Sequence, residues 1–267
     1  MGSLFALPFF AGLMLAALLP LVGQLLRLRD EWLATLGFAH LATFGVLLGT
    51  ALHVPPFAGA LAGALAGAGL KHAGGGRSNS AYGLMILAGW SLTLLVAANT
   101  TLGDALAHAL IDGQIYFAGQ RELAIDFVVT LAAWAALRWM SPRLIAARLF
   151  PARERTQAVR TWRWHLGFDV LVATCIAAGT ATFGLMAAFA LVFVPPWIAY
   201  RHASDWRHAQ WWAAGTGIAA YGVAFGLALG LDQPFGPMLG AVLVAGFGAS
   251  ALWRRSSLNS PTGSQAC

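Results

Sequence analysis

The sequence predicts an all-α protein, a polytopic transmembrane helix bundle of about eight or nine spans with one short additional helix. Three observations support this. Of 267 residues, 59% are hydrophobic and only 10% are charged, against roughly 25% charged residues in an ordinary soluble domain. The apolar residues gather in runs of a length suited to a hydrocarbon core ~30 Å thick, which needs ~20 residues per helix. Basic residues follow every second run, as they do in multi-pass membrane proteins.

The same composition excludes several classes of protein. A mean hydropathy of +0.70 indicates more apolar surface than one soluble core could bury, which excludes a soluble enzyme and a disordered regulator. The 16 Lys and Arg residues lie between apolar runs and form no continuous face, so no nucleic-acid partner is expected. Cys175 and Cys267 form neither a CxxC pair nor a disulfide framework.

The first four predicted spans are bounded by charged or turn-forming residues. The first lacks the basic leader of a cleavable signal and is too long for one, so it is read as a membrane span. The third is short and rich in Gly and Ala, which allow close helix approach in lipid. These spans cover residues 4–26, 32–53, 56–70 and 81–100.

Region 101–121 is too polar to cross the membrane freely. We expect residues 103–112 to form a short helix near the outer face, because irregular backbone at membrane depth must pack on protein or line water. Five more spans follow, of which the seventh is short and separated from the sixth by a tight junction at 182–184. They cover residues 123–140, 165–182, 184–200, 209–230 and 234–252.

Charge distribution predicts the orientation. The junctions after even-numbered spans carry no Lys or Arg except Arg121, whereas those after odd-numbered spans are basic. The positive-inside rule therefore predicts an outside N-terminus and a cytoplasmic C-terminus. Residues 1–255 form the transmembrane domain in this reading, and residues 256–267 form a polar cytoplasmic tail expected to be disordered. The basic residues at the odd junctions are Arg27, Arg29, Lys71, Arg77, Arg138, Arg143, Arg148, Arg153, Arg155, Arg160, Arg163, Arg201, Arg207, Arg254 and Arg255.

Three stretches carry a family resemblance. Residues 33–49 contain Ala-His before an apolar run that closes on Gly, and residues 183–201 place Gly, Pro and Arg in a fixed order around an apolar run. Residues 231–237 read LDQPFGP, an Asp-x-Pro-x-Gly-Pro turn before the last span. In this order and spacing, the set resembles the permease subunits of bacterial ABC importers for zinc, manganese and iron(II).

The resemblance implies a type II ABC importer permease that is homodimeric, with a path for the metal along the two-fold axis. It further implies a multi-pass protein of the bacterial inner membrane, a periplasmic metal-binding protein as partner and a cytoplasmic ATPase subunit as the energy source. The chain contains no GxxxxGK[ST] motif, so it is not expected to bind ATP through a P-loop or to act as an enzyme. No bound cofactor is expected. The cargo is a divalent transition metal (zinc, manganese or iron) or a metal chelate.

The longest basic connection, residues 142–163, is the predicted cytoplasmic coupling loop that meets the ATPase. The family commonly has an acidic residue after Ser-Pro, whereas Ser141 and Pro142 are followed here by Arg143. We predict that three arginines contact the ATPase. An alternative is that the loop anchors the protein on anionic membrane lipid, and both roles are compatible. The three are Arg148, Arg153 and Arg155.

His40 occupies the position of the family's metal-contacting histidine. The family places an Asp one helical turn earlier, but this chain has Leu36 there. Zinc favours imidazole nitrogen with help from carboxylate or thiolate, so loss of the Asp leaves the choice of metal open. The alternative role for His40 is that of a packing residue.

A second candidate set lies in region 103–112. Asp104, His108 and Asp112 are spaced i, i+4 and i+8, which places them on one stripe of a helix. They are predicted to supply, at the outer mouth, the acidic and imidazole ligands missing at Leu36. The alternative is an exposed amphipathic helix with Asp104 near its N-cap. Asp126 and Asp169, near span ends, are expected either to be hydrated or to line the path.

Three other kinds of membrane protein are alternatives to an importer permease. A secondary transporter would carry two repeated halves with broken helices, and no such repeat is visible. An intramembrane hydrolase would need a nucleophile motif such as GxSxG or HExxH, and neither occurs. A non-transporting membrane scaffold is the remaining alternative.

Overall fold

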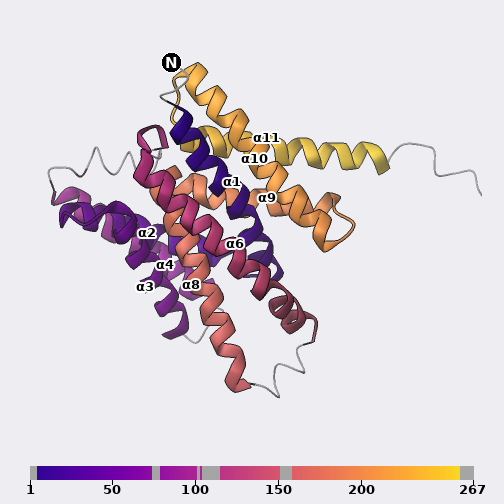
Figure 1. Ribbon diagram of the computed structural model, residues 1–267, viewed down its shortest axis with the longest axis horizontal. Helices are drawn as coiled ribbons and strands as arrows, with labels where there is room; N and C mark the ends of the chain where they lie inside the picture. Colours follow the sequence, from indigo (N-terminus) through magenta and orange to yellow (C-terminus); the bar gives the residue numbers. More distant parts are fainter. Residues whose placement is uncertain (1–4, 74–78, 101–102, 104–114, 151–157, 259–267) are drawn as a thin grey trace, which may run out of the picture.

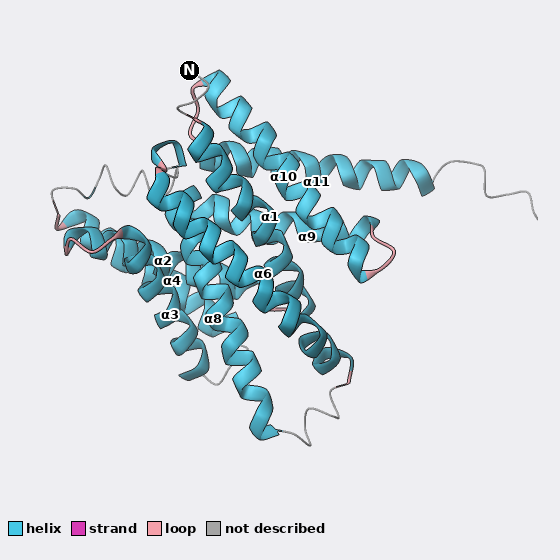
Figure 2. Ribbon diagram, in the orientation of Figure 1, coloured by secondary structure: helices cyan, strands magenta, loops and turns pink. Residues whose placement is uncertain are grey.

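The computed structural model describes residues 5–73, 79–100, 103, 115–150 and 158–258. In this part of the chain the secondary structure is entirely helical (Figure 2), which confirms the predicted fold class. The helices are α1 (Ala6–Leu28), α2 (Trp32–Ala51), α3 (Pro56–Ala73), α4 (Asn79–Ala98), η1 (Ile115–Phe117), α6 (Gln120–Leu149), α8 (Ala158–Phe183), α9 (Leu185–His202), α10 (Trp206–Leu231) and α11 (Phe235–Leu258).

Eight of these helices are long and apolar enough to cross a membrane. Among the α-helices of the described residues, α3 alone does not qualify, because its 18 residues include Lys71 and His72. All nine predicted spans correspond to α-helices, so the helical count is that expected from the apolar runs.

Burial divides the bundle into a core and a periphery. More than half of the residues in the apolar segments of α1, α2, α8 and α9 are buried, against fewer than a third in α4, α6, α10 and α11. In Figure 1, α1, α8 and α9 run through the middle, with α2, α3 and α4 gathered on one side and α10 and α11 on the other. The peripheral helices expose large apolar side chains such as Leu84, Val128 and Trp211, as expected for lipid-facing surfaces.

Very close helix packing joins α2 to α3 through glycines. A Cβ on Gly45 would fall on the carbonyl oxygen of Gly59, and one on Gly59 would fall on that of Gly45. Gly63 lies equally close to the Leu41 carbonyl. Small residues thus let two backbones touch without intervening side chains.

We expect Gly45→Ala to destabilise the fold by about 1–3 kcal/mol, because the added methyl group must push the α3 backbone away. The matched control is Gly83→Ala on α4, where a Cβ meets nothing within 4 Å, and this change should leave stability unchanged or slightly higher. SDS-induced unfolding in mixed micelles measures the free energy of unfolding of both variants. Equal effects of the two substitutions would show that the α2–α3 contact is not tight.

The predicted tight junction between the sixth and seventh spans is confirmed. Gly184 alone separates α8 from α9, with φ of 85°. Residues with a side chain rarely adopt this conformation, which glycine takes at no steric cost. Gly184 therefore ends one helix and caps the next in a single residue.

Some predicted boundaries differ from the structure. The coupling segment 142–163 was expected to be a loop, but α6 continues through Pro142 to Leu149 and α8 already begins at Ala158. The tail predicted to be disordered from residue 256 is helical up to Leu258. Apart from Gly103, the predicted outer helix 103–112 lies outside the described residues.

The helix connections gather at two ends of the bundle. One, here called the basic end, contains residues 27–31, 71–72, 143–148, 162–169 and 197–208. Arg27 lies over the rings of Trp197 and Tyr200 at 4.2 and 4.9 Å, and the contacts among the other segments are described below. The opposite end contains an aromatic cluster in which Tyr221 packs against Phe9, Phe183, Phe225 and Phe235, with ring centroids 5.6–5.8 Å apart. This arrangement brings together the basic junctions that the sequence predicted to lie on one side of the membrane.

Candidate metal pathway and coupling surface

His40 lies on α2 at its seam with α4. Its side chain is buried, with 6% exposed, and its ring is 6.0 Å from the Trp90 ring, edge to face. A Cβ on Gly89 would come within 2.7 Å of His40 backbone and Cβ atoms, so glycine allows α4 to approach α2 at this point. Trp90 itself is 42% exposed, which places His40 just beneath the surface of the bundle.

One hydrogen bond determines the tautomer of His40. Its Nδ1 lies 2.8 Å from the carbonyl oxygen of Leu36. Because a carbonyl only accepts, Nδ1 must carry the proton, and the neutral ring presents a lone pair at Nε2. Metal-binding histidines are commonly oriented in this way, with the second nitrogen donating to a carbonyl. His40 is therefore chemically suited to ligation through Nε2.

The other predicted metal ligands cannot be compared with the structure. Asp104, His108 and Asp112 lie outside the described residues. Within the described ranges, no group of three or more His, Cys, Asp and Glu side chains is arranged to hold a metal ion. Any site formed by this part of one chain alone thus has too few protein ligands for a structural zinc site.

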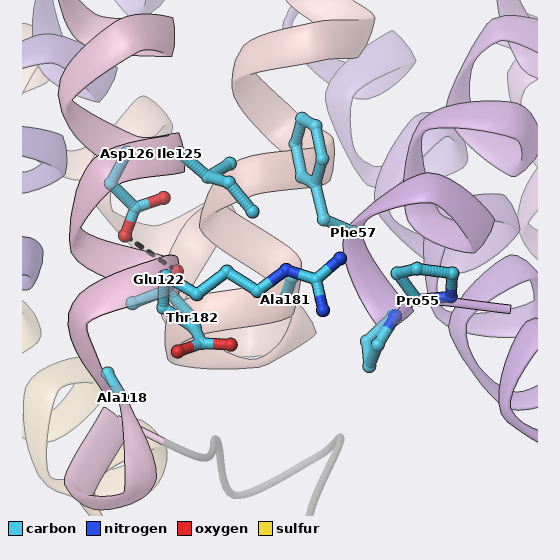
Figure 3. A pocket seen from close by; sticks show the side chains of 10 residues that line it. Pro55, Phe57, Ala118, Glu122, Ile125, Asp126, Ala181 and Thr182 are labelled. Carbon is cyan, nitrogen blue, oxygen red and sulfur yellow. Dashed lines mark hydrogen bonds between the residues drawn. The ribbon is translucent and has the colours of Figure 1, made fainter.

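A pocket of about 110 Å³ opens at the opposite end of the bundle (Figure 3). The Asp126 carboxylate, only 2% exposed, accepts a hydrogen bond of 3.0 Å from the Thr182 hydroxyl. Glu122 lies one turn earlier on α6, and its carboxylate accepts the Gly119 N–H at 2.9 Å. The lining residues are Pro55, Pro56, Phe57, Ala118, Arg121, Glu122, Ile125, Asp126, Ala181 and Thr182.

Asp126 and Asp169 were expected to be hydrated or to line the path, and the structure buries both, at 2% and 1% exposed. Asp126 lines the pocket just described. Asp169 belongs instead to a cluster of charges at the basic end, so the two residues of similar sequence context have different surroundings.

This buried charge cluster joins three parts of the chain. Lys71 Nζ lies 3.0 Å from Glu31 Oε2 and 2.6 Å from Asp169 Oδ1. Arg29 contacts Glu31 at 2.9 Å, and His72 lies 3.3 Å from Asp169. Lys71 and the two acids are each no more than 3% exposed in their side chains. The cluster therefore ties the α1–α2 turn and α8 to the end of α3.

Glu31 has a strongly perturbed pKa. Burial alone would raise the pKa of its carboxyl, but the positive charges of Arg29 and Lys71 outweigh burial and lower the pKa from 4.5 to about 2. Its charged form is thus favoured by the fold, and its protonation opposes the fold.

We expect acid to destabilise the protein through Glu31. Because the folded pKa lies below the unfolded value, the contribution is complete above about pH 4.5 and is lost as pH falls towards 2. Unfolding measured over this range should show a steeper loss of stability for the wild type than for Glu31→Gln. Parallel pH profiles would exclude Glu31 as the source of acid sensitivity.

Of the three arginines predicted to contact an ATPase, only Arg148 is described. Its guanidinium forms an ion pair of 2.8 Å with Asp30, with side chains 48% and 77% exposed respectively. Arg153 and Arg155 lie outside the described residues. Arg143, in the same segment, lies over the rings of Trp139 and Trp164 at 4.8 and 4.3 Å, joining the end of α6 to the start of α8.

Sequence reasoning missed the pairing of Arg29, Glu31, Lys71 and Asp169, which are up to 140 residues apart. A signal was nevertheless present, since charges next to apolar runs in so uncharged a chain are costly to bury without partners. All four lie at predicted ends on the same side of the membrane, which makes pairing geometrically possible.

Comparison with known proteins identifies the family. The family model for the ABC 3 transport family matches residues 4–253. The chain belongs to this family. It is therefore a non-catalytic transmembrane subunit of an ABC transporter, as its lack of a P-loop predicted. No curated protein matches the sequence.

Two solved structures share the fold of this ABC 3 family member. One is PsaBC from Streptococcus pneumoniae in complex with Fab, with a TM-score of 0.81 and 17% identity, covering 92% of this chain and 90% of that chain. The other is described as an inward-facing conformation of a metal-chelate type ABC transporter, with a TM-score of 0.75 and 15% identity, covering 92% and 84%. At these identities the likeness establishes the fold.

Proposed function

We propose that this protein is the inner-membrane permease subunit of an ABC importer that moves a divalent transition metal, as an ion or a chelate, into the cytoplasm. The observation that carries the proposal is His40, a buried imidazole within a membrane helix whose Nδ1–H bonds to Leu36 and whose Nε2 is left with a lone pair. Family membership and the description of one structural relative as a metal-chelate type ABC transporter support a metal cargo.

A single His40 is a weak ligand for a cargo ion, which must in any case be held loosely enough to leave. We propose that two copies form a homodimer in which each contributes His40. Its position beneath the surface, beside the partly exposed Trp90, fits a site completed by a second chain. Asp104, His108 and Asp112 are the proposed outer ligands, and His108 should be protected from chemical modification by the metal.

The proposed partners are a cytoplasmic ATPase and a periplasmic metal-binding protein. The N-terminus then lies outside and the basic end faces the cytoplasm, where the segment of residues 142–163 meets the ATPase through Arg148, Arg153 and Arg155. Arg143, in the last part of α6, lies over the rings of Trp139 of α6 and Trp164 of α8, which supports a role of this end of α6 as a firm docking surface. Anionic lipid is the other partner suited to so basic a surface.

The test is uptake. A deletion strain should lose one of zinc, manganese and iron from its cytoplasm, and the wild-type gene should restore it. In proteoliposomes, the chain purified with its ATPase should transport that metal with ATP, either free or chelated. Absence of an associated ATPase would refute the importer, and ATPase association without any metal uptake would leave the scaffold alternative.

A further inference from the structure

Two adjacent acids in the α1–α2 turn point in opposite directions. Asp30 is largely exposed, whereas Glu31 is 1% exposed. The backbone of Asp30 is left-handed, with φ of 57°, a conformation that Asp and Asn tolerate better than most residues. This local turn explains why neighbours in sequence reach different partners.

The outward acid reaches the segment proposed to dock the ATPase. Asp30 Oδ2 pairs with Arg148 Nη2 at 2.8 Å, and Arg148 lies in the last turn of α6. The two residues are 118 positions apart in the chain. This ion pair therefore transmits movement of the C-terminal end of α6 to the α1–α2 turn.

The inward acid reaches the transport helices. Glu31 precedes the first residue of α2, the helix that carries His40, and contacts Lys71 of α3 at 3.0 Å. Lys71 in turn contacts Asp169 of α8 at 2.6 Å. A displacement of the turn therefore acts on the start of α2 and, through Lys71, on α3 and α8.

We propose that Asp30 is a positioning residue for transport, through which Arg148 passes movement of the ATPase-docking segment to α2. The proposal rests on the proposed function, since it needs an ATPase at the basic end. Asp30 acts through its ion pair with Arg148. Glu31, the next residue in the same turn, pairs with Arg29 and Lys71. The pair is thus a mechanical link, which replaces the predicted direct contact of Arg148 with the ATPase and leaves Arg153 and Arg155 as the predicted contacts.

The experiment measures cargo transported per ATP hydrolysed by the chain and its ATPase in proteoliposomes. Asp30→Asn keeps a residue that accepts the left-handed turn and removes the charge, and Arg148→Gln removes the partner charge. Each should lower the transport-to-hydrolysis ratio about 1.5- to 5-fold, the range that corresponds to loss of an exposed ion pair. The double substitution should be no worse than either single one. Arg148→Lys, which keeps the charge, should retain most of the coupling.

Two matched control substitutions test whether loss of any exposed charge changes the transport-to-hydrolysis ratio. Asp232→Asn changes an exposed Asp of the same left-handed conformation, φ 52°, at the opposite end, and Arg207→Gln changes an exposed Arg at the basic end. Both should leave the ratio unchanged. Co-purification of the ATPase should be equal for all variants.

Three results would overturn the inference. If the single substitutions leave the ratio unchanged, the pair carries no coupling. If their effects add fully in the double variant, they act separately. If Arg148→Gln releases the ATPase while Asp30→Asn does not, Arg148 is an ATPase contact and not a partner of Asp30 in transmission. A wild-type chain that holds no ATPase would refute the proposed function as well.

Discussion

His40→Leu is expected to lower metal uptake on the order of 10–100-fold, the range seen when groups that support a metal site are removed. Leu fills the buried position beside Trp90 and Gly89 without a lone pair at Nε2. The fold should persist, because the Leu36 carbonyl that accepts from Nδ1 remains within α2. Uptake assays in proteoliposomes, with complex assembly measured in parallel, check this result.

The matched control is His202→Leu at the end of α9, whose ring packs against Trp212 at 5.6 Å. It should leave uptake close to that of the wild type. If His40→Leu also transports normally while remaining folded, His40 is a packing residue, and the metal path must be sought at other residues.

Lys71→Met is expected to cost about 3–5 kcal/mol of stability, the range for breaking a buried ion pair. The substitution leaves Glu31 and Asp169 buried at the basic end without the cation that both contact. SDS-induced unfolding in mixed micelles should show the loss, with reduced accumulation of the protein in membranes as a second readout.

His72→Gln provides the control, because its ring is 34% exposed and 3.3 Å from Asp169, and it should cost less than about 1 kcal/mol. A third variant that combines Lys71→Met with Asp169→Asn removes the uncompensated charge of Asp169, while Glu31 keeps its ion pair with Arg29, and it should recover much of the loss. If it is no more stable than Lys71→Met alone, unpaired charge is not the cause of the defect.

The helices could be predicted from the sequence because apolar runs of membrane length have few alternatives in lipid. The first run, predicted as 4–26, forms a helix at Ala6–Leu28.

The C-terminal end of α6 differs from the prediction, because the sequence predicts the end of a membrane helix from the end of its apolar run. The predicted span ends at Met140, where the apolar run stops, yet the helix continues for another two turns. Pro142 has no backbone N–H to donate within α6. The Ser141 hydroxyl donates a hydrogen bond to the Leu137 carbonyl one turn earlier, and the helix continues through the polar segment.

The site residues were only partly accessible to sequence reasoning. His40 was identified by motif, but its tautomer depends on a carbonyl that only the helix places at Nδ1. The charge cluster depends on α3 and α8 lying side by side, which no local pattern encodes. Arg148 was selected for its charge, whereas the structure adds a partner, Asp30, from a turn 118 residues away.

The two polar bonds of α8 have a mechanical consequence. Near one end, Asp169 is bonded to Lys71 of α3, and near the other, Thr182 is bonded to Asp126 of α6. These attachment points are 13 residues apart, roughly 20 Å along a helix axis. Helix α8 cannot slide along its axis relative to α3 and α6 without breaking one of these two bonds. The two bonds therefore favour movement of α3, α6 and α8 together over sliding of α8 past its neighbours.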